Sequence, residues 1–302
     1  MNEQTHSYNP NHLITVIYLL YNDVDFIERS LNSLLNQTYK NFNLYIIDDC
    51  STDGSHEIAI GFQDKFKNFT IRRNLTNYGI SYNMEKSVGY VDTKYIMWAG
   101  DDDMWSPNFI ETAIEALEED KDERFIVAFG KVVFIDSADN IKKDLPFRNI
   151  DFSSDITLYR IFKLIVAKDD SFGYGVLRRK MIVGVKFPIW SWVNKKVAYN
   201  NIYPSLLFYL SLGDYKRINV TWYNRLKDSA KINHFNHSKL LKNIIYYWLR
   251  RFELTIFSLK LLRKAKTEFY ILFFTSILLF INWFVLDSIK YSVLKITGLK
   301  ND

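Results

Sequence analysis

The residues Tyr95-Ile96-Met97-Trp98-Ala99-Gly100-Asp101-Asp102-Asp103-Met104-Trp105 decide how the chain is organised. Their apolar part has the composition of a buried strand, and it stops at Gly100. Three carboxylates follow at once, and their mutual repulsion near pH 7 implies that something nearby offsets their charge. Ser106-Pro107 then begins a helical pattern, with Ser at the cap position and Pro at the first helical position.

The acidic triplet is compatible with a metal site. In the turn after a strand, the alternate residues Asp101 and Asp103 can aim oxygens at one point, which suits a hard divalent cation. Such an ion keeps some of its waters and takes substrate phosphates as further ligands. The alternative is an acidic surface turn without a metal, because Asp is favoured in turns and helix caps.

The first 135 residues alternate between strand and helix patterns. Apolar runs predict strands over 13–20, 42–47, 69–72, 94–99 and 125–135, with helical patterns between them. This alternation favours a parallel, doubly wound sheet, in which ligands bind beyond the carboxyl ends of the strands. Asp48-Asp49 and Asp101–Asp103 follow two of these strands, so we expect a ligand site at that edge of the sheet.

Composition and short motifs exclude several classes of protein. The net charge of +5 is too small to predict a nucleic-acid partner without a concentrated basic patch. The single cysteine, Cys50, excludes an internal disulfide and a Cys-rich metal site, and it fits a reducing compartment. Residues 1–11 are polar and lack the apolar core of a signal peptide, which predicts a cytoplasmic N-terminus. A glycine-rich phosphate loop with a Walker lysine is missing, which argues against a kinase or an NTPase.

A family resemblance rests on five segments, which are Val16–Asn22, Ser30–Tyr39, Ile46–Ser55, Asn77–Asn83 and Tyr95–Asp103. In residue type and spacing they resemble the family 2 glycosyltransferases, over roughly residues 13–135. The resemblance implies a GT-A fold, an α/β architecture with a doubly wound, mostly parallel sheet. It also implies inverting transfer of a sugar from a nucleotide-sugar donor, with UDP as the expected nucleotide and Mg²⁺ or Mn²⁺ as the expected cofactor.

The resemblance assigns roles to individual residues. Tyr21 and Asp49 would contact the nucleobase, while Asp101, Asp102 and Asp103 look like the DXD element that touches the ribose and the metal-bound diphosphate. Asp101 and Asp103 are the expected metal ligands. The expected donor-binding residues are Tyr21, Asp48, Asp49, Asn77, Asn83, Asp101 and Asp102.

The second half departs from the family pattern. The family places an acidic pair, whose second member is the general base, where this chain has Asn200-Asn201 before a predicted helix over 203–213. An amide cannot act as a base near pH 7, so the base stays unassigned, with Asp169 and Asp170 as candidates. A non-catalytic sugar-nucleotide-binding homologue or partner subunit is therefore an alternative. A nucleotidyltransferase is another, but Tyr21-Asn22-Asp23 offers no glycine-rich loop after the first strand.

Three other features of the second half concern substrate binding. Ser171–Arg179 resembles the family strand that walls the acceptor site, or it is a Gly-spaced strand with exposed arginines. Trp190 and Trp192 either form a stacking platform for a sugar ring or simply pack. Arg225 and Lys227 are candidates to neutralise the leaving diphosphate.

A change of composition after about Ser229 divides the chain into two predicted parts. Residues 1–228 form the catalytic domain, with a nucleotide-sugar half (13–135) and an acceptor half (136–228), and residues 229–302 form a helical tail. Basic and apolar residues interleave over 240–262, which is typical of an amphipathic helix at a membrane surface.

Residues 269–286 carry no charge, and their length is near the lower limit for a transmembrane helix. An interfacial helix, a short span, and a hairpin packed on the catalytic domain or on a second subunit all remain open. We expect the protein to be cytoplasmic and attached to, or anchored at, the inner face of the cell membrane. Its expected acceptor there is a growing surface glycan or a lipid-linked molecule.

Overall fold

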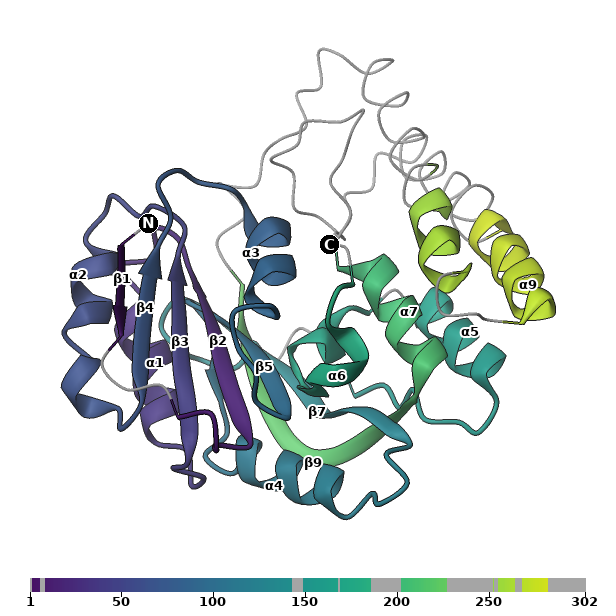
Figure 1. Cartoon of the computed structure of the whole chain (residues 1–302), viewed down its shortest axis with the longest axis horizontal. Coiled ribbons are helices and arrows are strands. Elements are labelled where there is room, and N and C mark those ends of the chain that lie inside the picture. The colour runs from purple at the N-terminus through teal and green to yellow at the C-terminus, as the bar shows by residue number, and fades with distance from the viewer. Residues whose placement is uncertain are drawn as a thin grey trace, which may run out of the picture.

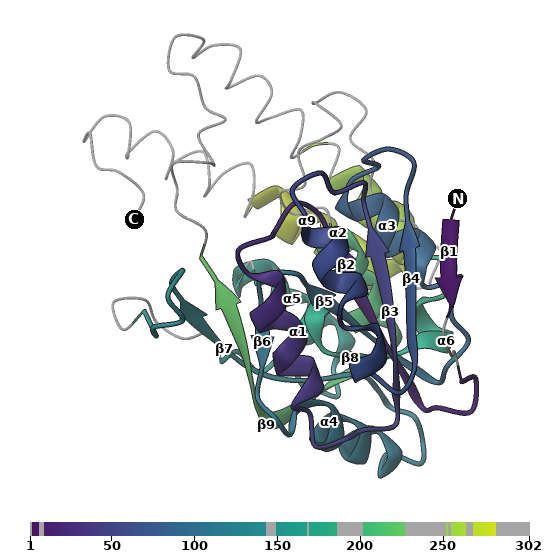
Figure 2. The same ribbon diagram turned by 90° about the vertical axis from the view of Figure 1, so that its left-hand side faces the viewer.

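The structure is a computed structural model of the chain, and it describes residues 2–5, 9–142, 149–167, 169–185, 202–226, 252, 255–263 and 268–281. The strands of these residues form one nine-stranded mixed sheet, in the order β1-β4-β3-β2-β5-β8-β7-β9-β6. Figures 1 and 2 show helices on both faces of the sheet, with α1 and α2 on one side of its first half and α3 on the other.

The centre of the first half is a four-stranded parallel sheet. Its strands are β2 (Ile14–Leu20), β3 (Phe42–Asp48), β4 (Phe69–Arg73) and β5 (Tyr95–Gly100). They pair in parallel in the order β4-β3-β2-β5, which confirms the predicted doubly wound arrangement. The carboxyl ends of these strands therefore lie at one edge, where Asp49 follows β3 and Asp101 follows β5. β1 (Asn2–Thr5) adds an antiparallel edge strand beside β4 that the sequence did not predict.

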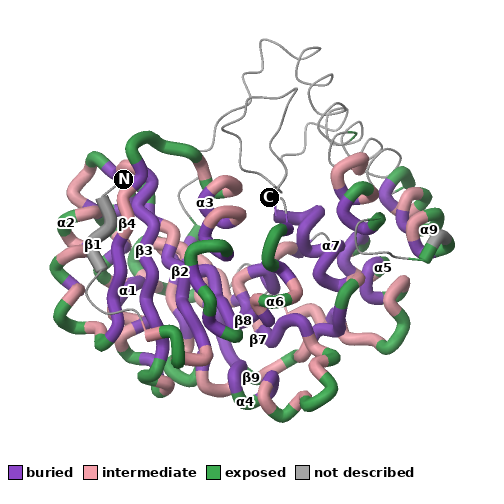
Figure 3. Tube along the Cα trace, in the orientation of Figure 1, coloured by how far each residue is buried: buried purple, intermediate pink, exposed green. Residues whose placement is uncertain are grey.

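Amphipathic helices connect these strands. The helices of the first half are α1 (Ile27–Leu35), α2 (Ser55–Ile60), α3 (Ile80–Ser87) and α4 (Phe109–Glu118). α1 buries Ile27, Leu31 and Leu34, whose spacing of three and four residues puts them on one helix face. Figure 3 shows the result, with strands buried along their length and helices exposed on their outer sides.

The helix after the acidic turn begins later than predicted. α4 starts at Phe109, with Asn108 rather than Ser106 at the cap position. Ser106 is engaged by a neighbouring strand, because its backbone N–H donates to Thr221 O (2.9 Å) and its hydroxyl accepts from Thr221 N–H (3.1 Å). The hydrogen bonds between Ser106 and Thr221 of β9 thus prevent Ser106 from capping the helix.

The second half extends the sheet with strands of mixed direction. They are β6 (Met104–Trp105), β7 (Phe125–Ile135), β8 (Val176–Arg178) and β9 (Asp214–Arg225). β8 lies antiparallel between β5 and β7, and β9 pairs in parallel with β7 and antiparallel with β6. The predicted strand over 171–179 is shorter than expected, since Ser171–Tyr174 forms a turn of 3₁₀ helix.

Helices of the second half cover this extension. They are α5 (Thr157–Ala167), α6 (Arg179–Ile182), α7 (Tyr203–Leu212) and α9 (Phe269–Leu279). α9 packs on α5, and Ile271 and Leu279 join the same hydrophobic core as the sheet. Within the described residues, every helix is too short or too polar to cross a membrane. The predicted uncharged run 269–286 is described only as far as residue 281, and most of 240–262 lies outside the described residues.

Candidate active site

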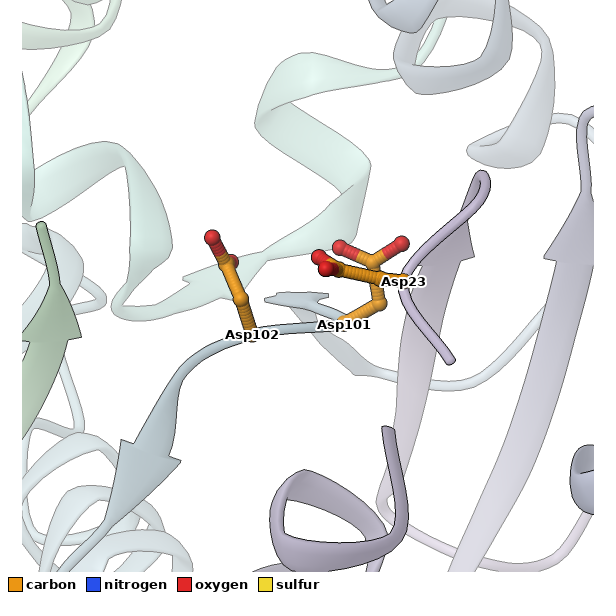
Figure 4. Close-up of side chains that lie close together, drawn as sticks. All are labelled: Asp23, Asp101 and Asp102. Carbon is orange, nitrogen blue, oxygen red and sulfur yellow. The ribbon is translucent and has the colours of Figure 1, made fainter. Parts of the chain in front are cut away.

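Three carboxylates meet at the carboxyl ends of β2 and β5. Asp101 and Asp102 follow β5, and Asp23 follows β2, the strand beside it. One oxygen of each lies within 4.8 Å of the others, and Figure 4 shows the Asp23 and Asp101 side chains close together with Asp102 beside them. The parallel pairing of β2 and β5 brings these residues together. Sequence analysis missed Asp23, although its position directly after the first strand was a usable signal.

Hydrogen bonds from β2, from the loop after it and from α1 hold the acidic turn in place. Tyr21 N–H donates to Oδ2 of Asp101 (2.7 Å), and the Tyr18 hydroxyl donates to the Asp101 carbonyl (3.4 Å). Burial raises the pKa of Tyr18 well above its usual value, and the negative charge of Asp101 adds to this rise. On α1, the Ser30 hydroxyl donates to the Gly100 carbonyl (3.0 Å) and so fixes the end of β5. The acidic turn is therefore anchored to both flanking elements.

The donor set fits a divalent cation. Carboxylate oxygens are the ligands that Mg²⁺ and Mn²⁺ prefer, and three of them converge here. Two of the three are only partly buried, so water and phosphate oxygens could complete the coordination.

Asp103 lies outside this cluster, although the sequence predicted it as a metal ligand. Its Oδ1 accepts from the backbone N–H of Arg225 (3.0 Å) and from Nδ2 of Asn224 (3.2 Å), both on β9. Burial raises the pKa of Asp103 well above its usual value, and the neighbouring charge of Asp102 raises it further. A Cβ at Gly100 would come within 3.0 Å of Asp103 Oδ2, so glycine leaves room for this inward turn.

Asp49, at the end of β3, organises a second part of the site. Its Oδ1 accepts from Nδ2 of Asn74 (2.8 Å) and from Tyr78 N–H (2.9 Å), and its Oδ2 accepts from Gly79 N–H (2.8 Å). Asn74 Nδ2 also donates to Oδ1 of Asn83 (2.8 Å), which is one of the expected donor-binding residues. Asn74, which sequence analysis did not single out, thus bridges Asp49 and Asn83.

Asp48 is fully buried beneath Asp49. Its Oδ1 accepts from Ser51 N–H (2.9 Å), and its Oδ2 lies 2.8 Å from Nδ1 of His56 and 3.1 Å from Nε of Arg73. These last two contacts are at ion-pair distance without hydrogen-bond alignment. Asp48 therefore orders the turn after β3 and presents no oxygen to solvent.

The other predicted donor-binding residues lie at the surface of the same edge. The Tyr21 side chain is exposed directly after β2, and Asn77 is exposed in the loop after β4. Beside Asn77, the rings of Tyr78 and Tyr82 stack with centroids 4.7 Å apart.

The acidic cluster and the Asp49 network are physically linked. Asn22 N–H donates to the Ser51 hydroxyl (3.1 Å), Thr52 N–H donates to Oδ1 of Asn22 (2.8 Å), and Asp23 N–H donates to the Ser55 hydroxyl (2.9 Å). The loops after β2 and β3 therefore form one rigid rim. A nucleotide bound at Asp49 and a cation bound at Asp23 would sit on the same rim.

The two candidate bases face different surroundings. Asp169 is buried, and its Oδ1 accepts from Ser171 N–H (2.9 Å). Asp170 is partly exposed, and it lies near Tyr174, whose ring stacks on Trp222 (4.7 Å). Burial raises the pKa of Tyr174, with further contributions from Asp170 and from the carboxylates of the acidic turn. Tyr174 is thus within electrostatic reach of both Asp170 and the acidic turn.

Several expectations concern residues outside the described part of the chain. These are Trp190, Trp192, Asn200, Asn201 and Lys227. Arg225, predicted to neutralise the leaving diphosphate, is described and is buried instead.

This architecture defines the class of protein. A parallel α/β half with acidic side chains after three of its strands, extended by strands of mixed direction, is the GT-A arrangement that the sequence resemblance implied. The family model described as glycosyl transferase family 2 matches residues 15–183, more than half of the chain. The chain belongs to glycosyl transferase family 2.

Curated relatives match part of the chain. An uncharacterized glycosyltransferase of Rickettsia conorii is 28% identical over 149 residues, which cover 47% of this chain and 24% of that protein. The putative teichuronic acid biosynthesis glycosyltransferase TuaG of Bacillus subtilis is 28% identical over 107 residues, which cover 35% of this chain and 42% of TuaG. The matched segment thus spans less than half of each relative.

Solved structures share the fold. TarS of S. aureus, residues 1–349 in complex with UDP-GlcNAc, aligns with a TM-score of 0.58 and 17% identity, covering 81% of this chain and 66% of that one. The mannosyltransferase PcManGT of Pyrobaculum calidifontis, in complex with GDP-Man and Mn²⁺, aligns with a TM-score of 0.53 and 14% identity, covering 98% and 79%. At these identities the likeness establishes a common fold.

Proposed function

We propose that the protein is a glycosyltransferase that moves a sugar from a nucleotide-sugar donor to a growing surface glycan or a lipid-linked acceptor, with inversion at the sugar carbon. The observation that carries this proposal is the cluster of Asp23, Asp101 and Asp102 beside the Asp49 network, within a family 2 domain. The names of relatives are consistent with it, since TuaG is named for teichuronic acid biosynthesis and TarS is seen with UDP-GlcNAc.

In this proposal the nucleotide lies along the rim formed by the loops after β2 and β3. Asp49 holds the loop of Tyr78 and Gly79 in place. Its Oδ2 accepts from Gly79 N–H, and the second lone pair of that oxygen would accept a nucleobase N–H. Tyr21 offers an exposed ring at the end of β2 on which a base can lie. UDP is the nucleotide we expect.

Asp23, Asp101 and Asp102 would hold Mg²⁺ or Mn²⁺ at the diphosphate end of the donor. The ion would supply positive charge to the diphosphate as it leaves. The protein residues contribute a rigid anionic platform, because Tyr21 N–H fixes Asp101 and the Ser55 hydroxyl accepts from the backbone of Asp23. Asp103 fixes the acidic turn to β9 by accepting hydrogen bonds from Asn224 and Arg225.

Asp170 is the general base in this proposal. It is partly exposed, and both it and the acidic turn act electrostatically on Tyr174, so in this proposal it accepts the proton of an acceptor hydroxyl that approaches the donor sugar there. Asp169 is less suited to the role, because it is buried and one of its oxygens accepts from Ser171 N–H.

The tail, residues 229–302, would attach the catalytic domain, residues 1–228, to the inner face of the cell membrane. Within the described part of the tail, α9 contains no charged residue, and α9 together with the two residues after it carries exposed apolar side chains. They are Tyr270, Phe273, Phe274, Ile277, Phe280 and Ile281. In this proposal these apolar side chains enter the interface of a bilayer, where a lipid-linked acceptor would be found.

The deciding experiment measures donor binding and donor hydrolysis with UDP-, GDP-, dTDP- and CMP-sugars, with and without Mn²⁺. We expect one donor to bind in a metal-dependent way, and we expect Asp23→Asn and Asp102→Asn each to weaken that binding. Asp64→Asn, which changes an exposed carboxylate away from the site, is the matched control and should leave binding unchanged.

Each outcome has a meaning. Metal-dependent binding with turnover supports the transferase. Intact donor binding without turnover, even with a membrane extract as acceptor, favours a non-catalytic sugar-nucleotide-binding protein, as the asparagines at 200 and 201 suggest. Absence of binding to every donor contradicts the proposal.

A further inference from the structure

Arg225, at the end of β9, is a buried arginine in direct contact with the acidic turn. Its side chain is 1% exposed. Its Nε donates to the backbone carbonyl of Asp102 (2.9 Å), while its own backbone N–H donates to Oδ1 of Asp103 (3.0 Å). One residue therefore holds the turn at two successive positions.

The remaining donors of the guanidinium are also directed into the protein. Nη1 donates to the carbonyl of Asp136, and Nη2 pairs with Oδ1 of Asp139. The face of the guanidinium lies over the ring of Phe26, 4.4 Å from its centroid. With its nitrogens engaged in this way, Arg225 is poorly placed to neutralise a leaving diphosphate directly, in contrast to the role expected from sequence.

Arg225 is itself oriented by a neighbouring ion pair. Asp139 accepts from Arg225 through Oδ1 and from Nη1 of Arg29 through Oδ2 (2.9 Å). Arg29 belongs to α1, and Asp139 belongs to the turn after β7. Two arginines and the carboxylate between them thus connect α1, the end of β7 and the acidic turn.

These contacts have two consequences for the carboxylate cluster. The hydrogen bond to the Asp102 carbonyl fixes the backbone from which the Asp102 side chain projects, so it restricts where the carboxylate points. The guanidinium also places a permanent positive charge behind adjacent carboxylates that repel one another, which is the compensation that the sequence predicted.

We propose that Arg225 is a positioning residue for the metal site, which it preorganises by clamping the backbone of Asp102 and the side chain of Asp103. This inference rests on the proposed function, since it assumes that Asp23, Asp101 and Asp102 hold the cation. Groups behind a metal site orient its ligands, and their loss weakens metal binding even though they never touch the ion.

The test is Mn²⁺ binding, followed by the electron paramagnetic resonance of the free ion, in the full chain and in Arg225→Gln, Arg225→Lys and Asp139→Asn. We expect Arg225→Gln to weaken Mn²⁺ binding by about tenfold or more, as for other groups that orient metal ligands. Arg225→Lys, which restores the charge but not the planar fork, should recover part of the loss. Asp139→Asn should give a smaller loss. Binding of UDP without metal should be unchanged in all three.

The matched control is Arg160→Gln. Arg160 is also buried and donates to backbone carbonyls, in its case those of Leu210 and Ser154, and it lies on α5 away from the acidic turn. This variant should lose thermal stability while it retains full Mn²⁺ affinity. The comparison separates positioning of the cluster from a general loss of stability.

The outcomes are distinct. A folded Arg225→Gln protein with wild-type Mn²⁺ affinity overturns the inference, and so does an equal loss in Arg160→Gln. If Arg225→Gln does not fold, Asp139→Asn decides: weaker Mn²⁺ binding supports the inference, and unchanged binding overturns it. Failure of the wild-type chain to bind Mn²⁺ removes the metal site itself, and with it the metal-dependent mechanism of the proposed function.

Discussion

Adjacent carboxylates of the acidic turn have different surroundings. An oxygen of Asp102 lies within 4.8 Å of oxygens of Asp23 and Asp101, and Asp102 is partly exposed, whereas Asp103 is buried and accepts hydrogen bonds from β9. Burial favours the neutral form of Asp103, which limits the negative charge that the turn carries. In this proposal Asp101 and Asp102 bind the cation, while Asp103 stabilises the turn through its hydrogen bonds to β9.

At the residue scale, we expect Asp49→Asn to damage both stability and donor binding. An asparagine has a single acceptor oxygen, so it cannot satisfy the backbone N–H groups of Tyr78 and Gly79 from two sides as Asp49 does. A buried donor left unpaired costs about 1–3 kcal/mol. Urea denaturation and titration with the donor measure the two effects.

The control for this prediction is Asp64→Asn, an exposed position that should change neither quantity. Wild-type donor affinity in a folded Asp49→Asn protein would contradict the role of the Asp49 network in the donor pocket.

We expect Asp170→Asn to lower kcat strongly and to leave donor affinity close to that of the wild type. General-base catalysis contributes about 10²–10⁴-fold to rate, so a loss in this range identifies the base. Steady-state kinetics with the donor found in the panel measure it. Asp169→Asn is the neighbouring comparison: if it carries the loss while Asp170→Asn does not, the assignment to Asp170 is wrong.

At the element scale, the short strand β8 is stabilised by one buried arginine. Arg178 donates to the carbonyls of Leu117 (2.6 Å) and Phe125 (2.7 Å) and to Oδ2 of Asp120 (3.0 Å). These groups belong to the end of α4, the start of β7 and the turn between them. A strand of three residues is thereby fixed between β5 and β7 with little hydrogen bonding of its own.

We expect Arg178→Met to destabilise the protein by about 1–3 kcal/mol near pH 7, because it leaves the carbonyls of Leu117 and Phe125 without their donor and Asp120 without its cationic partner. Burial opposes ionisation of Asp120, but hydrogen bonds from the backbone and from Arg178 hold its pKa below the usual value of 3.8. A depressed carboxyl pKa stabilises the folded state above pH 3.8, and this contribution is lost as pH falls through the folded pKa.

The difference in unfolding free energy between the wild type and Arg178→Met should therefore shrink below about pH 4. Denaturant titrations at pH 7 and at pH 3 measure it. Lys180→Met, which removes an exposed cation two residues away, is the control and should show a much smaller effect. A difference that stays constant over this pH range contradicts the role of the ion pair with Asp120.

At the scale of the whole molecule, one sheet joins the parallel first half to the mixed second half. β8 pairs with β5 on one side and with β7 on the other, and β9 returns to β6 directly after the acidic turn. The acidic turn thus lies where the two halves meet. The strands of the described residues form a single sheet, and α9 packs on α5 beside its second half.

Membrane attachment is a prediction at this scale. We expect the full chain to sediment with vesicles that contain anionic lipid and Phe274→Glu/Ile277→Glu to lose this binding, because both side chains are exposed on α9 and a charge there opposes insertion. The melting temperature should change little. Leu75→Glu, at an exposed apolar position far from α9, is the control and should sediment as the wild type does. Equal sedimentation of all three proteins contradicts a lipid-facing role for α9.

The sequence alone predicted the parallel core and the acidic edge. An apolar run bounded by turn residues identifies a buried strand without knowledge of the strand it pairs with. The strands before Asp49 and Asp101 were identified in this way. The family followed from the spacing of motifs within the same stretch, and the family match confirms it. These features depend on local pattern, which a sequence carries directly.

Only the tertiary structure decided which acids lie together. Asp23 joins Asp101 because β2 pairs with β5, and Asp103 leaves them because β9 supplies the N–H of Arg225 from 122 residues further along the chain. The late start of α4 has the same cause, since pairing with Thr221 engages Ser106. Contacts between distant strands override local signals, because a buried polar group must find its hydrogen-bond partner wherever the fold provides one.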